Sequence, residues 1–110
     1  MADNNSIMLK GRLVKDVEVI QLATGTIIGR LQLAVTNKRK IQGELKENTF
    51  IIDVIKGNFK ENLAYKLKQG ALVQVKGFLE FRRFPNLSWN IVEKWEVVAE
   101  EAAILKEEKK

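Results

Sequence analysis

The chain has 110 residues, of which 45% are apolar and 30% charged, so we expect one globular domain with its own hydrophobic core. Cysteine and histidine are both absent, which excludes zinc sites with nitrogen or sulfur ligands, histidine general bases and cysteine nucleophiles. There is also no glycine-rich phosphate loop, so we expect no enzymatic activity, cofactor or metal. The formal net charge is +5.

The basic excess lies in the body of the chain. Residues 1–92 contain fifteen Lys or Arg against eight Asp or Glu, a net charge of +7, whereas residues 93–110 carry a net charge of −2. A polyanion-binding surface would therefore belong to the body of the domain. No apolar run approaches the ~20 residues of a membrane-spanning helix, and the polar N-terminus does not resemble a signal peptide. We expect a cytoplasmic protein that does not contact membranes.

Two strands joined by a hairpin turn are predicted first. Residues 6–14 have high β propensity, and Gly11 among them is typical of a bulge or a sharp bend in a barrel strand. Residues 23–26 predict the turn, in which Gly25 supplies a positive φ. Residues 27–36 predict the second strand.

A polar segment over residues 37–48 follows, and we interpret it as a long hairpin loop that leads to a third strand over residues 49–56. Three consecutive cations, Lys38, Arg39 and Lys40, lie in this segment. A run of charge in a loop is by default solvated. Three cations in a row can also follow a phosphate backbone, so they are candidate phosphate contacts.

One short helix is predicted over residues 59–68. Asn58 is placed to cap it, and Glu61, three residues later, completes a capping box. Gly70 is expected to end the helix in a left-handed conformation. One apolar stripe would pack the helix on the end of a barrel, and it consists of Phe59, Leu63 and Leu67.

Two more strands are predicted in the last third. Residues 71–81 form the fourth strand, with Gly77 as a second bend point. Residues 85–86 make a short turn, and residues 88–99 form the fifth strand. Residues 100–110 are highly charged and are expected to be a frayed helical or disordered end.

The predicted order is strand, strand, strand, helix, strand, strand. This all-β arrangement with one short helix matches the five-stranded oligonucleotide-binding (OB) barrel, whose binding face lies on strands two and three and the flanking loops. We expect one such domain over residues 1–104, followed by a disordered charged end over residues 105–110.

Aromatic residues beside cations are the candidate binding groups, because a ring can stack on a base while Arg neutralises the neighbouring phosphate. Phe84 follows Arg82 and Arg83 and precedes a predicted turn, so we expect it at a loop edge, in contact with ligand. Phe81 shares the parity of the apolar residues of its strand, and burial is the favoured interpretation.

Phe50 begins the third predicted strand, and both faces of that strand are largely apolar, so its periodicity allows either core packing or base stacking. Trp89 lies near the loop between the last two strands and is a further stacking candidate. Weaker candidates for phosphate contact are Arg12, Lys56 and Lys76.

An ordered set of short segments resembles the bacterial single-stranded DNA-binding protein family over roughly residues 6–104. The segments are Leu9–Asp16, Thr24–Gly25, Leu31–Val35, Gly57, Tyr65–Gly70, Val73–Leu79 and Glu96–Glu100. The resemblance implies a cytoplasmic, nucleoid-associated homotetramer that binds and protects single-stranded DNA during replication, repair and recombination.

In this family, aromatic side chains stack on bases, and Phe50 and Phe84 match two of these positions. Lys56 stands where the family often has a third aromatic, and residues 38–40 replace a tryptophan with cations. These changes exchange stacking for charge, so we expect weaker or more salt-sensitive binding than the family norm. The family's acidic C-terminal tip, which recruits replication and repair proteins, has no counterpart in residues 105–110.

Three other classes remain open from the residues alone. One is a primosomal OB-fold protein, which acts as a dimer in replication restart. Another is an RNA-binding or ribosome-associated OB module, which would read the 2′-hydroxyl. A third is a protein-interaction barrel whose exposed aromatic residues contact another protein.

Overall fold

Six strands and one 3-10 turn make up residues 3–106, the part of the chain that this computed structural model describes. The elements are β1 (Ile7–Leu13), β2 (Glu18–Gln21), β3 (Ile27–Ile41), β4 (Glu44–Lys56), η1 (Glu61–Leu63), β5 (Leu72–Pro85) and β6 (Ile91–Lys106). Neighbouring strands follow the order β1-β5-β6-β4-β3-β2, and an additional pairing between β1 and β3 closes the sheet. Both β1 and β2 pair with the same edge of β3, so together they fill one position in the barrel. The barrel therefore has five strands, as predicted for an OB fold.

Glycines lie where strands of the barrel approach most closely. Arg12 pairs with Leu72 of β5 and with Ala34 of β3, so β1 passes from one neighbour to the other at this point. A Cβ atom on the adjacent Gly11 would lie 2.4 Å from the carbonyl oxygen of Ala34. The pairing of β5 with β6 shifts register at Gly77, which confirms the predicted irregularity there.

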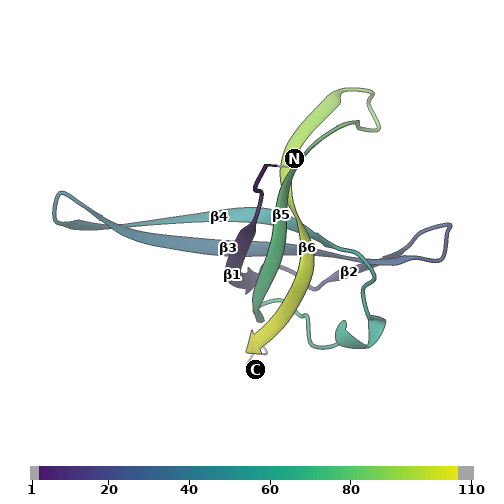
Figure 1. Cartoon of the computed structure of the whole chain (residues 1–110), viewed down its shortest axis with the longest axis horizontal. Helices are drawn as coiled ribbons and strands as arrows, with labels where there is room; N and C mark the ends of the chain where they lie inside the picture. Colours follow the sequence, from purple (N-terminus) through teal and green to yellow (C-terminus); the bar gives the residue numbers. More distant parts are fainter. Residues whose placement is uncertain (1–2, 107–110) are drawn as a thin grey trace.

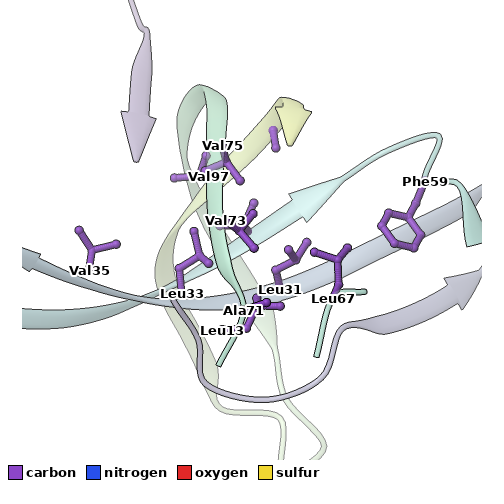
Figure 2. Close-up of a cluster of buried hydrophobic side chains, with 12 residues drawn as sticks. Leu13, Leu31, Leu33, Val35, Phe59, Leu67, Ala71, Val73, Val75 and Val97 are labelled. Carbon is purple, nitrogen blue, oxygen red and sulfur yellow. The ribbon is translucent and has the colours of Figure 1, made fainter. Parts of the chain in front are cut away.

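The core fills the barrel with side chains that point inward from alternate positions of the strands (Figure 2). Its largest fully buried apolar side chains are Leu31, Leu33, Val54, Val73, Val75 and Val97. Val35 lies at one side of this cluster and Phe59 at the other (Figure 2). Each such side chain contributes roughly 1.5–3 kcal/mol through burial, so the barrel is the stable centre from which the rest of the chain extends.

The prediction of a helix over residues 59–68 is wrong both in the type of helix and in its length. Only Glu61–Leu63 form a single 3-10 turn. The residue before it is Lys60, which makes no side-chain capping bond, and Asn58 has a positive φ of 49°. The expected capping box is therefore not formed.

Backbone hydrogen bonds and burial hold this segment against the end of the barrel. The N–H of Phe59 donates to the carbonyl of Ile27, and the carbonyl of Leu67 accepts from Val17. Phe59 and Leu67 are buried against the barrel. The backbone bonds within the segment join residues three apart, so it closes the barrel end as a series of turns. Gly70 does have the expected positive φ, at 95°.

Two strand pairs continue past the barrel as arms (Figure 1). Residues 37–48, predicted to be a loop, instead extend β3 and β4 to a two-residue turn at Gln42 and Gly43. Likewise β5 and β6 remain paired as far as Pro85 and Ile91. We define the β3–β4 arm as residues 35–50 and the β5–β6 arm as residues 81–95.

The C-terminal segment also differs from expectation. Residues 100–106, expected to be frayed, continue β6 and pair with the beginning of β5, from Lys76 to Leu72. Pairing satisfies their backbone groups despite their charge. Residues 107–110 lie outside the described part of the chain. Within residues 3–106 the structure has no helix long and apolar enough to cross a membrane.

Candidate nucleic-acid interface

The β3–β4 arm has two chemically different faces, because side chains alternate along each strand. The inner face continues the core-facing side of the barrel, and its cross-strand pairs are Val35 with Phe50, Asn37 with Asn48, Arg39 with Lys46, and Ile41 with Glu44. The outer face carries the pairs Thr36 with Thr49, Lys38 with Glu47, and Lys40 with Leu45.

This alternation separates the three consecutive cations. Arg39 lies on the inner face, and its side chain forms no ion pair within residues 3–106. Lys38 lies on the outer face with its Nζ 3.4 Å from a carboxylate oxygen of Glu47, and Lys40 shares that face. The three charges therefore cannot contact one strand of nucleic acid from the same side of the arm.

Phe50 is partly buried and packs against the edge of the core, opposite Val35. Its position agrees with core packing, and base stacking by this ring stays a prediction. One part of the ring supports the barrel, and the rest is accessible where the inner face of the arm begins. Asn48 and Lys46, which follow on the same face, were not identified from the sequence, because a continuous strand was not predicted there.

The β5–β6 arm presents cations and rings on both faces. On the outer face, the guanidinium of Arg82 lies 4.9 Å from the ring centroid of Phe84 and 3.2 Å from a carboxylate oxygen of Glu96. On the inner face, Arg83 forms an exposed ion pair of 3.3 Å with Glu93. The outer-face cation–π pair has the composition predicted for a stacking site.

An exposed aromatic pair on the inner face was not predicted. The rings of Phe81 and Trp95 lie 5.0 Å apart between centroids, with their planes tilted by 54°. Phe81 is 43% exposed and Trp95 58% exposed, so the expectation that Phe81 is buried is wrong. Its parity is that of the core residues, but β5 has already left the barrel at this position.

The tip of the β5–β6 arm exposes apolar side chains on a hydrogen-bonded turn. Trp89 is 82% exposed and has a positive φ of 61°. The side-chain oxygen of Asn86 accepts hydrogen bonds from the backbone N–H groups of Ser88 and Asn90, which holds the turn. Trp89 and Phe84 line the same shallow recess at this tip. The structure thus places two of the predicted stacking residues together.

Three predicted cations lie on the barrel body and not on the arms. The guanidinium of Arg12 donates to the carbonyl of Gly70 at 2.9 Å, and Lys56 donates to the carbonyl of Gly57 at 2.8 Å. Lys76 is exposed on β5. The predicted site residues therefore form two groups, one on each arm, with these three outside both.

A charged network on the outer face of the barrel joins four strands. Lys94 of β6 lies 2.6 Å from a carboxylate oxygen of Asp53 on β4, and Gln32 of β3 donates to the other oxygen at 2.9 Å. Burial raises the pKa of Asp53, but the hydrogen bonds from Lys94 and Gln32 and the positive charges nearby outweigh it and hold this pKa below its usual value. Glu96 is 2% exposed and is paired with Arg82, so Arg82 has a structural partner as well as a candidate role in binding.

A closed five-stranded OB barrel whose arms carry accessible rings and cations is typical of nucleic-acid-binding proteins. The chain belongs to the single-strand binding protein family, whose family model matches residues 4–105. Members of this family bind single-stranded DNA, and so does this protein.

Two relatives agree with this membership. The chain is 36% identical over 101 residues to single-stranded DNA-binding protein 3 of Streptococcus agalactiae, covering 92% of this chain and 73% of that protein. It is 37% identical over 101 residues to single-stranded DNA-binding protein 1 of Streptococcus pyogenes, covering 92% of this chain and 78% of that protein.

Two solved structures share the fold. The Plasmodium falciparum SSB complex with ssDNA superposes with a TM-score of 0.80 at 22% identity, over 96% of this chain and 98% of that one. A deletion mutant of the single-stranded DNA-binding protein from Thermus aquaticus superposes with a TM-score of 0.81 at 24% identity, over 94% of this chain and 51% of that one.

Proposed function

We propose that this protein binds single-stranded DNA without sequence preference and without catalysis, and that its two arms provide most of the contacts. The observation that carries the proposal is that the β5–β6 arm presents accessible rings beside cations, while the β3–β4 arm carries a partly accessible ring and cations along one face. Rings stack on any base, and cations neutralise any phosphate, so this chemistry tolerates sequence.

On the β3–β4 arm, the accessible part of Phe50 stacks on a base and Arg39 neutralises a phosphate on the same face. Lys38 and Lys40 face the other side, where they add positive potential around the arm. Lys56, Arg12 and Lys76, on the barrel body, act only through such longer-range attraction, or on a strand that passes from the arms over the barrel.

On the β5–β6 arm, Phe84 and Trp89 offer stacking surfaces at the tip, and Arg82 and Arg83 contribute charge. The Phe81–Trp95 pair adds two rings on the inner face. Arg83 exchanges its exposed partner Glu93 for a phosphate at little cost, because an ion pair between exposed side chains contributes only ~0–1 kcal/mol.

The protein acts in this proposal as a cytoplasmic homotetramer that covers and protects single strands during replication, repair and recombination. Family membership supports this assembly and role. Light scattering separates four subunits from two, and two subunits would favour a primosomal role instead.

The experiment that tests the proposed site removes one ring at a time and leaves an apolar side chain. Phe50→Leu and Phe84→Leu are each expected to weaken binding of oligo-dT at every salt concentration, because a stacked base contributes ~1–3 kcal/mol. Tryptophan fluorescence follows the titration at two ionic strengths. Tyr65→Leu is the matched control, since Tyr65 is 67% exposed but lies outside both arms.

Charge and ligand class are tested in the same titrations. Arg39→Ala is expected to reduce the slope of log K against log salt by ~0.7, the value for one phosphate contact on a single strand. If both Phe variants fold and bind like the unmodified protein, the site assignment is wrong. Equal binding of duplex DNA, or tighter binding of a matching RNA, would overturn the preference for single-stranded DNA.

A further inference from the structure

A recess on the inner face of the β3–β4 arm has the chemistry of a base-edge site. It is lined by the side chains of Asn37, Arg39, Lys46 and Asn48 and has a volume of about 320 Å³. The two carboxamides face each other across the strands in register, and the two cations form the next cross-strand pair toward the tip. Figure 1 shows how far this arm extends from the barrel.

Three successive cross-strand pairs on this face differ in chemistry. The pair nearest the barrel contains Phe50, the next contains Asn37 and Asn48, and the third contains Arg39 and Lys46. Successive pairs on one face of a strand are ~7 Å apart. A stacking surface, hydrogen-bonding groups and positive charge therefore follow one another at a spacing that neighbouring nucleotides can reach.

The carboxamides have unused hydrogen-bonding capacity. Within residues 3–106, neither the Asn37 nor the Asn48 side chain hydrogen-bonds to another protein group, although the adjacent outer-face pair Thr36 and Thr49 bond to each other at 2.8 Å. Each carboxamide carries an acceptor oxygen and two N–H donors. Such a group pairs with the adjacent donor and acceptor on the edge of an unstacked base.

We propose that Asn37 and Asn48 hydrogen-bond to the edge of one unpaired base, and that Arg39 and Lys46 bind the flanking phosphate. This inference rests on the proposed binding of single-stranded DNA and adds a polar contact that stacking and charge do not supply. A carboxamide can turn over to exchange its donors and acceptor, so the pair accepts any natural base and requires only that the base has a hydrogen-bonding edge.

The cationic part of the site is only weakly occupied by protein carboxylates. Lys46 lies 3.0 Å from Glu44, and both side chains are more than half exposed, so a phosphate displaces this partner readily. Glu44→Gln is expected to strengthen oligo-dT binding slightly, because it removes the competing charge.

The test compares two oligonucleotides whose bases have the same shape but differ in hydrogen bonding. One is oligo-dT, and the other replaces each thymine by difluorotoluene, an apolar isostere of the base. The unmodified protein is expected to bind oligo-dT more tightly, by roughly fivefold for each hydrogen bond that the isostere lacks. In the Asn37→Ala/Asn48→Ala variant this preference should disappear. The cycle of two proteins and two oligonucleotides measures this coupling in the same way as a double-mutant cycle.

Variants of the neighbouring pairs separate this contact from the rest of the interface. Lys46→Gln should weaken binding of both oligonucleotides alike and reduce the slope of log K against log salt. The preference for oligo-dT should be retained. The Thr36→Ala/Thr49→Ala variant alters the opposite face and should retain both affinity and preference.

Each outcome has a distinct meaning. If the double Asn variant still prefers oligo-dT to the isostere as strongly as the unmodified protein does, the base-edge site is refuted while single-strand binding stands. If the unmodified protein binds both oligonucleotides equally, the base-edge site is likewise refuted. Failure of the unmodified protein to bind oligo-dT at all would instead refute the proposed function.

Discussion

At the scale of single residues, Gly77 and Gly57 differ in what a side chain would meet. A Cβ atom on Gly77 would lie 1.9 Å from the carbonyl oxygen of Val98, a backbone atom of the neighbouring strand, whereas Gly57 has no atom within 4 Å of such a position. Backbone in a closed barrel cannot shift without disturbing the pairs on either side. The absence of a side chain at residue 77 therefore allows β5 and β6 to pair at the register shift.

Gly77→Ala is predicted to lower the free energy of unfolding by about 1–3 kcal/mol, the usual cost of forcing extra atoms into a packed site. Urea denaturation measures the change. Gly57→Ala is the matched control and should be neutral or slightly stabilising, by up to ~1 kcal/mol, because it only restricts the unfolded chain. Equal stability of the two variants would show that β5 and β6 can separate at this point without loss.

At the scale of elements, the β3–β4 arm depends on its own turn and cross-strand pairs. Gln42 and Gly43 have φ values of 52° and 82°, the combination that a type I′ hairpin turn requires. Beyond Thr36 and Thr49 every side chain of the arm is exposed, so the core does not stabilise it. The arm is thus a part of the structure that can open locally while the barrel remains folded.

Gly43→Ala is predicted to loosen the arm, because a left-handed conformation costs an L-residue with a side chain roughly 1–2 kcal/mol. Amide hydrogen exchange of residues 37–48 should become faster, the melting temperature should change little, and oligo-dT affinity should fall as the arm loses preorganisation. Gly25→Ala is the control, since Gly25 has a φ of 91° in a different hairpin. Unchanged exchange in the Gly43 variant would contradict the assigned turn.

At the scale of the whole molecule, a barrel with two projecting arms presents a large accessible surface for its size. The molecule measures 53 × 37 × 37 Å, and the β3–β4 hairpin extends along its longest axis (Figure 1). The strands of the barrel are joined on the outside by the network around Asp53, which connects β3, β4 and β6. This network makes the stability of the whole barrel depend on pH.

The folded-state pKa of Asp53 lies below its usual value of 3.8, so its contribution to stability is complete above that pH and is lost as the pH falls through the lower folded value. Asp53→Asn is predicted to be less stable than the unmodified protein at pH 7, with a difference that shrinks toward pH 3. Urea denaturation at both pH values measures it. Glu18→Gln, at an exposed ion pair, should show little change at either pH; a constant difference for Asp53→Asn would contradict the assignment.

Several features of the fold follow from local sequence patterns alone. Alternating apolar residues predicted the strands of the barrel, Gly25 predicted a turn, and Gly77 predicted an irregularity. Each of these features depends on the preferences of a few adjacent residues. Those elements in that order, together with the family segments, were sufficient to predict the OB class. The residue types of the interface, rings and cations at strand ends, were also evident from the sequence.

Other features required the tertiary structure. The segment from Phe59 to Leu67 has a helical pattern, but its attachment to the barrel at both ends and the burial of Phe59 and Leu67 override it. The polar segment over residues 37–48 has few strand-forming apolar residues, yet it forms two paired strands. Backbone pairing between its two halves satisfies the hydrogen-bonding groups of both.

The faces of the arms are the clearest case. Which side of an arm carries Arg39, or exposes Phe81, depends on cross-strand register and on where the strand leaves the barrel. A shift of one residue in the pairing register moves every side chain of a strand to the opposite face of the sheet. Local patterns therefore determined the class of protein and the chemistry available to it, whereas only long-range strand pairing decided which of those groups share a surface.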